Sequence, residues 1–593
     1  MSGAIHRQLE AEGPIEVGIL RRWRELLDHP GLPEFFLAVL TGLVYARSLR
    51  MGFVYDDHQM IDSPWLLGWK DIPKIFTEDL GNTHLSNFYR PLAVLWQLLV
   101  HKLAGTNAAG WHFSTIFLHL LCVVLVFRLA VKLLKHRGYA TFAAAVFALH
   151  PSHVEVVTWV SDSADLLLTL FLLLSAWALL RWLHTTSPLW WTASWLLAAA
   201  CCFVKETGIL LPTLLLALAL TVESKVSRPA IVLTVFAYLL SACAFLVLRS
   251  QILHGFSHPL SNATNYQMVL TWPRAMYFYL SHLVLPVRLG PFYPLGFVLS
   301  PRKSAFIFPL LLLVALLAGL LWLDRRLPDR RLLWFCVVWT LVPLIAPLYL
   351  KLFPDFELVH DRYLYIPSIA FAIALAAVLR KLFLDTSANA THKRNAETCL
   401  ALAALVVLVA LGAETISYQG AWQDDEHLFS RAIVLTPRNA RALVNLAVAK
   451  LQQGNYAEGS ALLKRSLQIQ PNNAFALFDL GNAAWVNNDA VATEAYVARA
   501  LALESHPNWW VILGSAKLKL GKVSEAEWAA RQAIALDPAT PGAHFLLGAA
   551  RLAQGDPSTA VQEINNELRL YPGNPSAQQA LQVAQDQLRR QGN

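Results

Sequence analysis

Apolar residues are dense from about residue 34 to 417 and sparse afterwards, so the chain divides into an apolar part and a polar tail. A helix that spans a membrane needs about 20 apolar residues. The apolar part contains eleven stretches of this kind, which predicts a polytopic, all-α membrane bundle. The predicted spans are 34–50, 111–134, 139–158, 162–183, 188–204, 207–222, 229–248, 303–323, 332–350, 363–384 and 397–417.

Two further apolar segments, 91–104 and 268–288, are rich in aromatic and polar residues. We interpret both as helices that lie at the membrane interface or line a cavity; the alternative is that they also span the membrane. Among the predicted spans, 139–158 is the weakest, because the pair His150-Pro151 interrupts it.

The composition agrees with a membrane protein. Of the 593 residues, 56% are hydrophobic and only 15% are charged, whereas soluble domains have about 25% charged residues. The formal charge is +8, but no basic patch indicates a nucleic-acid partner. The six cysteines lie in or beside apolar stretches, so the polar tail carries no disulfide scaffold.

The location of the basic residues predicts the topology, because basic residues concentrate in cytoplasmic loops. The predicted cytoplasmic segments include the N-terminal segment 1–33. The loop 51–110 and the tail then lie on the non-cytoplasmic face. The basic residues that set this orientation are Arg21, Arg22, Arg24, Lys132, Lys135, Arg137, Lys225, Arg228, Arg325, Arg326, Arg330, Arg331, Arg380, Lys381, Lys393 and Arg394.

The tail is repetitive, with a period of about 34 residues over 437–572. Leucines recur with the period, a small residue follows each of them, and glycine or asparagine marks each turn. This pattern resembles four tetratricopeptide repeats, which would form an α-solenoid with a concave protein-binding groove after a linker at 418–436. A spacer or an oligomerisation element is the alternative, and 573–593 is predicted to be a capping helix. The recurring positions are Leu446, Leu480, Leu513, Leu547; Ala447, Gly481, Gly514, Gly548; Gly454, Asn488, Gly521, Gly555; Pro437, Pro471, Pro538 and Pro572.

Two adjacent acids, Asp56 and Asp57, follow the first span closely. Ionisable residues near hydrocarbon are costly and usually functional. Such a pair could take a proton from a hydroxyl nucleophile or hold a metal; the alternative is simple pairing with an arginine.

Other polar residues fall on the same predicted face. His150 and His153 could bind a metal together with Glu155 or Asp57, but polar packing or substrate contact is the favoured interpretation. Basic residues such as Lys205 and Arg362 could neutralise acidic neighbours or hold a lipid phosphate. The full set of candidate substrate-binding residues is Arg90, His150, His153, Glu155, Asp165, Lys205, Glu206, Asp361, Arg362 and Tyr363.

Six short motifs occur in order along the apolar part, and together with the repeats they resemble the transmembrane and tetratricopeptide-repeat O-mannosyltransferases. The resemblance covers nearly the whole chain and implies a compact, bacterial member with the C-type glycosyltransferase fold at 34–417. The motifs are Phe53-Val54-Tyr55-Asp56-Asp57, Tyr89-Arg90-Pro91-Leu92, His150-Pro151-Ser152-His153-Val154-Glu155, Ala164-Asp165-Leu166-Leu167, Lys205-Glu206-Thr207-Gly208 and Arg362-Tyr363-Leu364-Tyr365-Ile366-Pro367-Ser368.

The resemblance also implies a reaction. The donor would be a polyprenyl-phosphate sugar, and Asp56 or Asp57 would be the general base that activates a Ser or Thr hydroxyl of an acceptor protein, with inversion. Arg90, Lys205 and Arg362 would stabilise the leaving phosphate, so a divalent metal is possible but not expected. The implied location is a bacterial inner membrane, with membrane lipids around the bundle and the repeats in the periplasm, where they would hold the acceptor.

One departure concerns the sugar: Asp162-Ser163 replace the Gly-Arg that the family usually shows before Ala-Asp-Leu-Leu. Mannose is therefore a weaker expectation than a polyprenyl-linked sugar in general. The alternatives are a transferase acting on a glycan or lipid, a non-catalytic scaffold, and a transporter. The scaffold is disfavoured because an anchor does not need so many polar residues on one face.

Overall fold

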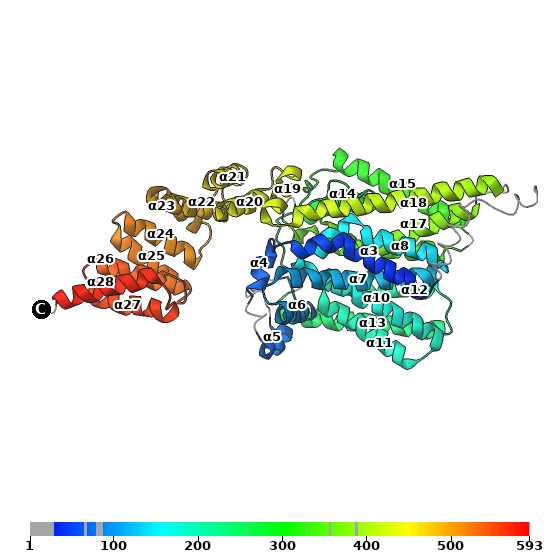
Figure 1. The fold of residues 1–593 in the computed structure, drawn as a ribbon, viewed down its shortest axis with the longest axis horizontal. Coiled ribbons are helices and arrows are strands. Elements are labelled where there is room, and N and C mark those ends of the chain that lie inside the picture. Colours follow the sequence, from blue (N-terminus) through cyan, green and yellow to red (C-terminus); the bar gives the residue numbers. More distant parts are fainter. Residues whose placement is uncertain are drawn as a thin grey trace, which may run out of the picture. The chain divides into compact units, whose positions relative to one another are not determined.

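The computed structural model describes residues 29–63, 68–78, 87–255, 258–327, 329–354, 357–385 and 390–591. It has two compact units, Met1–Arg431 and Ala432–Asn593. The described part of the chain is helical and contains no strand, which confirms the all-α prediction (Figure 1). Most of the predicted segment 1–33, parts of the loop 51–110, and the basic residues Arg21, Arg22, Arg24, Lys393 and Arg394 lie outside the described residues or side chains.

Each predicted span corresponds to a helix of the first unit. The helices are α3 Leu32–Tyr45, α7 Ala108–Leu134, α8 Arg137–Leu149 with α9 Val154–Thr158, α10 Ser163–Thr185, α11 Pro188–Val204, α12 Leu211–Thr221, α13 Arg228–Ile252, α15 Ser304–Arg326, α16 Arg331–Leu341, α17 Tyr365–Asp385 and α18 Ala390–Gln419.

The number of full-length spans is smaller than the eleven predicted. Within the described ranges, eight helical segments have the length and hydropathy to cross a membrane, and a bent pair makes up to nine. The bent pair is Arg137–Leu149 with Pro151–Thr158, which meet at 49°, because Pro151 cannot continue the α8 hydrogen bonds. Helices α11 and α12 are apolar but shorter.

The two segments interpreted as interfacial are also helical: α6 Pro91–Ala104 and α14 Asn265–Val284. Helix α6 is too short for a span, and α14 does not count among the candidate spans of the described chain. Both observations agree with the sequence-based interpretation.

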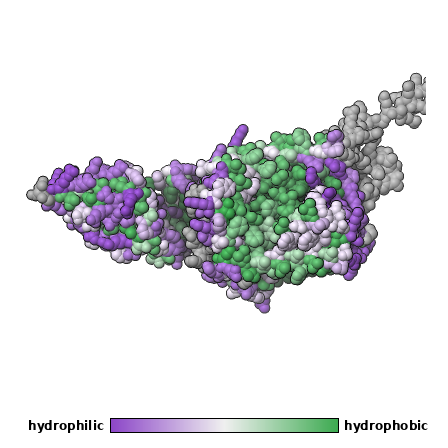
Figure 2. Space-filling view, turned by 90° about the horizontal axis from the view of Figure 1, so that it is seen from below, coloured by the Kyte–Doolittle hydropathy of each residue, from purple (hydrophilic) through white to green (hydrophobic). Residues whose placement is uncertain are grey.

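Helix α10 is the centre of the first unit. In the membrane-length stretch that contains α10, 78% of the residues are buried, whereas in the stretch that contains α15 only 6% are buried. Helix α10 packs against α7 and α11, and α8 packs against α7 and α17. Apolar side chains form a broad hydrophobic surface over this unit (Figure 2). Polar groups at the start of α10 are therefore held in the interior of the bundle.

The second unit consists of helix pairs at the predicted positions: α20 Ala440–Gln452, α21 Tyr456–Ile469, α22 Ala474–Val486, α23 Ala490–Leu501, α24 Pro507–Lys519, α25 Val523–Leu536, α26 Ala543–Ala553 and α27 Pro557–Leu570, followed by α28 Pro575–Gln591. The predicted turn residues Gly454, Asn488, Gly521 and Gly555 all have positive φ. A Cβ on Gly481 would lie 2.4 Å from Val497, which explains the small residue at this repeat position.

Candidate active site

The two adjacent acids differ completely in environment. Both belong to the first turn of the short helix α4, Asp56–Ile61. Asp56 is exposed, whereas Asp57 is fully buried. The Asp57 carboxylate accepts hydrogen bonds from the backbone N–H of Val54 at 3.1 Å and from the N–H and hydroxyl of Ser161 at 2.9 and 2.5 Å. Asp57 therefore holds α4 against the segment before α10, and Asp56 is the acid that is open to solvent.

Burial raises the pKa of Asp57 from its ordinary value of 3.8 to about 7. Hydrogen bonds from Ser161 and Val54 oppose this increase, and the neighbouring charge of Asp56 adds to it. The carboxyl group of Asp57 is thus close to half-protonated at neutral pH.

Three ion pairs join the motif segments. Arg90 binds Glu206 through two hydrogen bonds of 2.9 and 2.6 Å. Lys205 Nζ lies 2.6 Å from Asp165 and 3.8 Å from Asp162. These contacts bring the Tyr-Arg-Pro-Leu, Ala-Asp-Leu-Leu and Lys-Glu-Thr-Gly motifs together.

The third pair links two more motifs. Arg362 Nη1 lies 2.5 Å from Glu155, whose second oxygen accepts the Arg362 backbone N–H at 3.1 Å. His360 is also 3.8 Å from this carboxylate. Of the two alternatives for the candidate cations, the structure shows pairing with acids: each of Arg90, Lys205 and Arg362 has a carboxylate partner.

Asp361 and Tyr363 face different surroundings although they flank the same arginine. Asp361 is buried and accepts a hydrogen bond from the hydroxyl of Tyr293. The ring of Tyr363 lies 5.2 Å from the Arg362 guanidinium and 5.5 Å from Lys205 Nζ, so it contacts both cations.

The histidine pair is part of the core. His150 hydrogen-bonds to the Ser152 hydroxyl at 2.7 Å and to the Leu283 carbonyl at 3.0 Å. His153 lies 2.8 Å from the Ser368 hydroxyl, and both imidazoles are buried. Among the described residues no group of three or more potential ligands could hold a metal ion. His150 and His153 thus make polar contacts with groups of the core.

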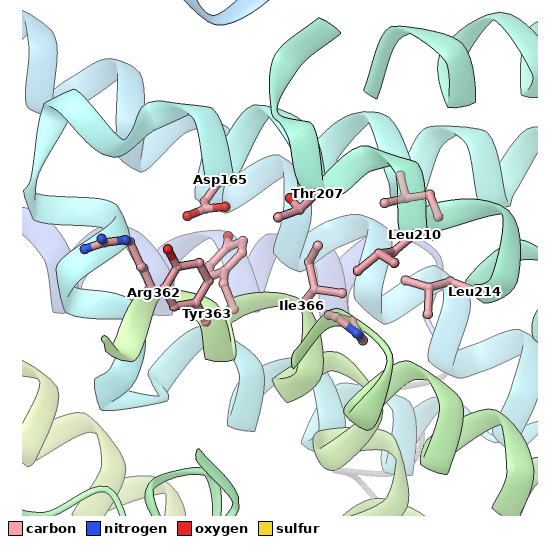
Figure 3. Close-up of a pocket in the computed structure, with 10 residues that line it drawn as sticks. Asp165, Thr207, Leu210, Leu214, Arg362, Tyr363 and Ile366 are labelled. Atoms are coloured by element: carbon pink, nitrogen blue, oxygen red, sulfur yellow. The ribbon is translucent and has the colours of Figure 1, made fainter. Parts of the chain in front are cut away.

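A pocket opens between α10, the start of α12 and the start of α17 (Figure 3). One end is polar, with Asp165, Thr207, Arg362 and Tyr363, and the other is apolar. Figure 3 shows the polar side chains on one side and the leucines on the other. The pocket thus has a charged end and an apolar end. The apolar lining residues are Leu210, Leu211, Leu214, Pro343 and Ile366.

Sequence reasoning missed three residues at this end of the bundle: Ser161, Tyr293 and Asp425. Ser161 directly precedes Asp162-Ser163, the pair that departs from the family motif. This departure was a local signal that could have pointed to Ser161. Tyr293 lies in an irregular loop, and Asp425 lies in the predicted linker, so neither had a local pattern that could identify it.

Both the apolar part and the tail of the chain are similar to known protein families. Residues 90–254 match the family described as dolichyl-phosphate-mannose-protein mannosyltransferase, and residues 418–474 and 511–575 match a tetratricopeptide-repeat family. Among solved structures, a crystal structure of MamA protein is 21% identical, with a TM-score of 0.23, and covers 24% of this chain and 80% of that one.

Several curated relatives are named protein O-mannosyl-transferases. F38B6.6 of Caenorhabditis elegans is 25% identical over 69% of this chain and 59% of its own length. TMTC1 of Mus musculus is 34% identical over 30% of this chain and 21% of its own length. TMTC3 of Homo sapiens is 23% identical over 71% of this chain and 50% of its own length.

The chain thus spans between about a fifth and three fifths of the length of these relatives. The matched membrane segment contains Arg90, Glu155, Asp165 and Lys205, which form the ion pairs described above. Residues 90–254 are thus similar to the dolichyl-phosphate-mannose-protein mannosyltransferase family, and parts of the C-terminal helices are similar to tetratricopeptide repeats.

Proposed function

We propose that the protein is a membrane glycosyltransferase that moves a sugar, mannose as first choice, from a polyprenyl-phosphate donor to Ser or Thr hydroxyls of proteins. The observation that carries this proposal is the contrast between Asp56 and Asp57: an exposed acid is held in place by a buried one. The ion-paired Arg362 of the pocket and the family match support it.

The pocket suits the donor. Its apolar end, which includes Leu210, Leu214 and Ile366, would hold the first isoprene units. The phosphate would lie at the polar end, where Arg362 and the nearby Lys205 supply positive charge. Their carboxylate partners Glu155 and Asp165 would then hold the two cations in orientation rather than neutralise them fully.

Asp56 would act as the general base. Its carboxylate takes the proton of the acceptor hydroxyl while the hydroxyl oxygen attacks the anomeric carbon from the side opposite the phosphate. The bond between this carbon and the phosphate oxygen breaks, polyprenyl phosphate leaves with the electron pair, and the configuration inverts. The leaving phosphate is stabilised by Arg362 and Lys205, which is the main electrostatic contribution of the site.

Asp57 would keep Asp56 in position, since its carboxylate ties α4 to Ser161. On this proposal the reaction takes place on the non-cytoplasmic face, and the repeats, located on that side, bind the acceptor protein. A tetratricopeptide groove suits an extended peptide that carries Ser and Thr side chains.

The test uses the purified full chain in lipid nanodiscs, with polyprenyl-phosphate mannose and a mixture of Ser/Thr-rich peptides. Asp56→Asn should lower the transfer rate about 10²- to 10⁴-fold, the usual contribution of a general base. Asp62→Asn is the matched control, because Asp62 is an exposed acid at the other end of α4. It should leave the rate unchanged.

Other results would overturn parts of the proposal. An Asp56→Asn protein that transfers sugar at the wild-type rate would refute the assignment of the base. Transfer to a glycan or lipid acceptor, but to no peptide, would replace the protein acceptor. A folded wild-type protein that consumes no polyprenyl-phosphate sugar would refute the catalytic function.

A further inference from the structure

The segment that leads to α4 is attached along its whole length to the segment that leads into the repeats. The Ser48 hydroxyl and the Val44 carbonyl both bind the side chain of Gln419. The backbone N–H of Gly52 donates to the Gln423 carbonyl at 3.1 Å. Residues that are more than 360 positions apart thus run side by side up to the proposed base.

Asp425 makes the last two of these contacts. It is the first residue of α19, Asp425–Leu435. One oxygen accepts the backbone N–H of Tyr55 at 2.8 Å, and the other lies 3.0 Å from His58 Nε2. Asp56 stands between Tyr55 and His58 in the sequence, so one carboxylate holds the residues on both sides of it.

The backbone at Tyr55 needs this support. Its φ is +54°, a region that residues with a side chain rarely adopt. Tyr55 is the N-cap of α4, so this conformation stands directly before Asp56 and the buried Asp57. The N–H of Tyr55 would lose its acceptor if Asp425 were removed, and the turn would lose a constraint.

Aromatic packing reinforces the same junction. The ring of Tyr55 contacts Phe429, one turn further along α19, with 5.7 Å between ring centroids. It also contacts Trp159, which in turn lies 5.4 Å from the Arg362 guanidinium. The junction thus connects α19 to the proposed base and, through one further ring, to the cation at the pocket.

The sequence pattern of α19 is that of the repeats, although α19 precedes the first predicted repeat. It ends at Leu435, one repeat period before the end of α21 at Ile469. Both ends are followed by one residue and then a proline, Pro437 and Pro471. The tetratricopeptide-repeat match likewise begins at residue 418. Helix α19 therefore resembles the second helix of a repeat whose first helix is absent.

We propose that Asp425 is a positioning residue for the transfer reaction: it fixes the turn that presents Asp56, and so makes the first helix of the repeat series part of the active site. This inference rests on the proposed function, because the residue that it positions is the proposed base. It goes beyond that function by assigning a catalytic contribution to the segment predicted to be a linker.

The test compares Asp425→Ala and Asp425→Asn with Asp424→Ala in the full chain. Asp424 is the matched control because it caps the same helix: it accepts the His427 N–H at 2.9 Å, and its side chain is about half exposed. Removal of Asp424 weakens α19 but leaves the contacts of Tyr55 and His58 intact. Initial rates are measured with polyprenyl-phosphate mannose and peptide, per amount of monodisperse protein.

A positioning role predicts a lower kcat and an unchanged KM for the donor. Asp425→Ala should lower kcat on the order of 10²-fold, as expected when a catalytic group is displaced by about 1 Å. Asp425→Asn should lose less but stay below the wild-type kcat, because its amide oxygen can accept the Tyr55 N–H while the negative charge that faces His58 is lost. Asp424→Ala should keep the wild-type kcat even though its thermal stability falls.

Equal kcat values for Asp425→Ala and Asp424→Ala would overturn the inference. If Asp425→Ala does not fold, the comparison of Asp425→Asn with Asp424→Ala decides in the same way. The proposed function is judged separately by Asp56→Asn. Loss of transfer in that variant combined with a normal Asp425→Asn refutes only the positioning role, whereas full activity of Asp56→Asn refutes the base assignment itself.

Discussion

The hydroxyl of Ser161 offers a way to tell the two acids apart without removing either. Ser161→Ala deletes the 2.5 Å hydrogen bond to the buried carboxylate of Asp57 and leaves the backbone N–H contact at 2.9 Å. Asp56 is exposed, and the substitution leaves its carboxyl group in place. The substitution therefore acts directly on the proton affinity of Asp57, and reaches Asp56 only through the weaker charge coupling between the two acids.

The size of the change follows from the contact. A hydrogen bond to a charged group contributes about 1.5–3 kcal/mol. The side chain of Ser161 is the strongest of the influences that lower the pKa of Asp57, which is about 7 with the bond present. Its loss should raise the proton affinity of Asp57 about 10- to 100-fold. The folded state should lose a similar free energy above pH 7, where the carboxylate is charged.

The assay is the pH dependence of kcat for wild type and Ser161→Ala, together with thermal unfolding of both. If Asp56 is the base, the acidic limb of the profile stays in place while the unfolding temperature falls. Ser163→Ala is the control: Ser163 is also buried near the start of α10, and its hydroxyl has no hydrogen-bond partner among the described residues. It should change neither measurement appreciably.

A shift of the acidic limb of the kcat profile to higher pH, by one pH unit or more, would refute this reasoning. It would mean that the buried Asp57 is the group whose ionisation controls the reaction, and the roles of the two acids would be exchanged. An unchanged unfolding temperature would contradict the stabilising contact itself.

Three further predictions concern stability. Lys205→Met should leave two buried carboxylates unpaired and destabilise the fold by about 3–5 kcal/mol. Lys205→Arg should lose much less stability, because it keeps the positive charge. The recovery of monodisperse protein after heating measures both effects. Gly208→Ala should prevent folding, since a Cβ at this position would lie 2.6 Å from the backbone of α11. Gly319→Ala is the control, because a Cβ there would meet open space, and it should be neutral or stabilise the fold by up to about 1 kcal/mol. The expression of folded protein measures the difference. Because the pKa of Asp57 is about 7 when folded and 3.8 in its ordinary state, the folded protein binds the extra proton between these values. Its stability should therefore decrease as the pH rises from about 4 to 7, and thermal unfolding of Asp57→Asn should lack this slope.

The fold was predictable because its signals are local. Long apolar runs locate the membrane helices, and a recurring leucine with a small neighbour locates the repeats. The exact lengths were not predictable, as α11 and α12 show: both are apolar but short, and α12 begins only after a turn at Glu206–Leu210. Proline and glycine change the helix axis by amounts that depend on the neighbouring helices.

The members of the site were predictable as a set, but not their individual environments. The motif residues Arg90, Glu155 and Lys205 do meet their partners across the bundle. Nothing in the local sequence distinguished His153, which is buried in the core, from Arg362, which lines the pocket. Their roles depend on solvent access, which a motif does not encode.

The sequence by itself determined that this chain has an apolar helical bundle, a repeat solenoid and a series of charged motifs, because hydrophobic length, period and charge placement act within single segments. Only the tertiary structure decided that Asp57 is buried against Ser161, that each candidate cation has its own carboxylate, and that Asp425 reaches the turn before Asp56. These properties depend on which distant segments exclude water from one another, and desolvation is a property of the assembled fold.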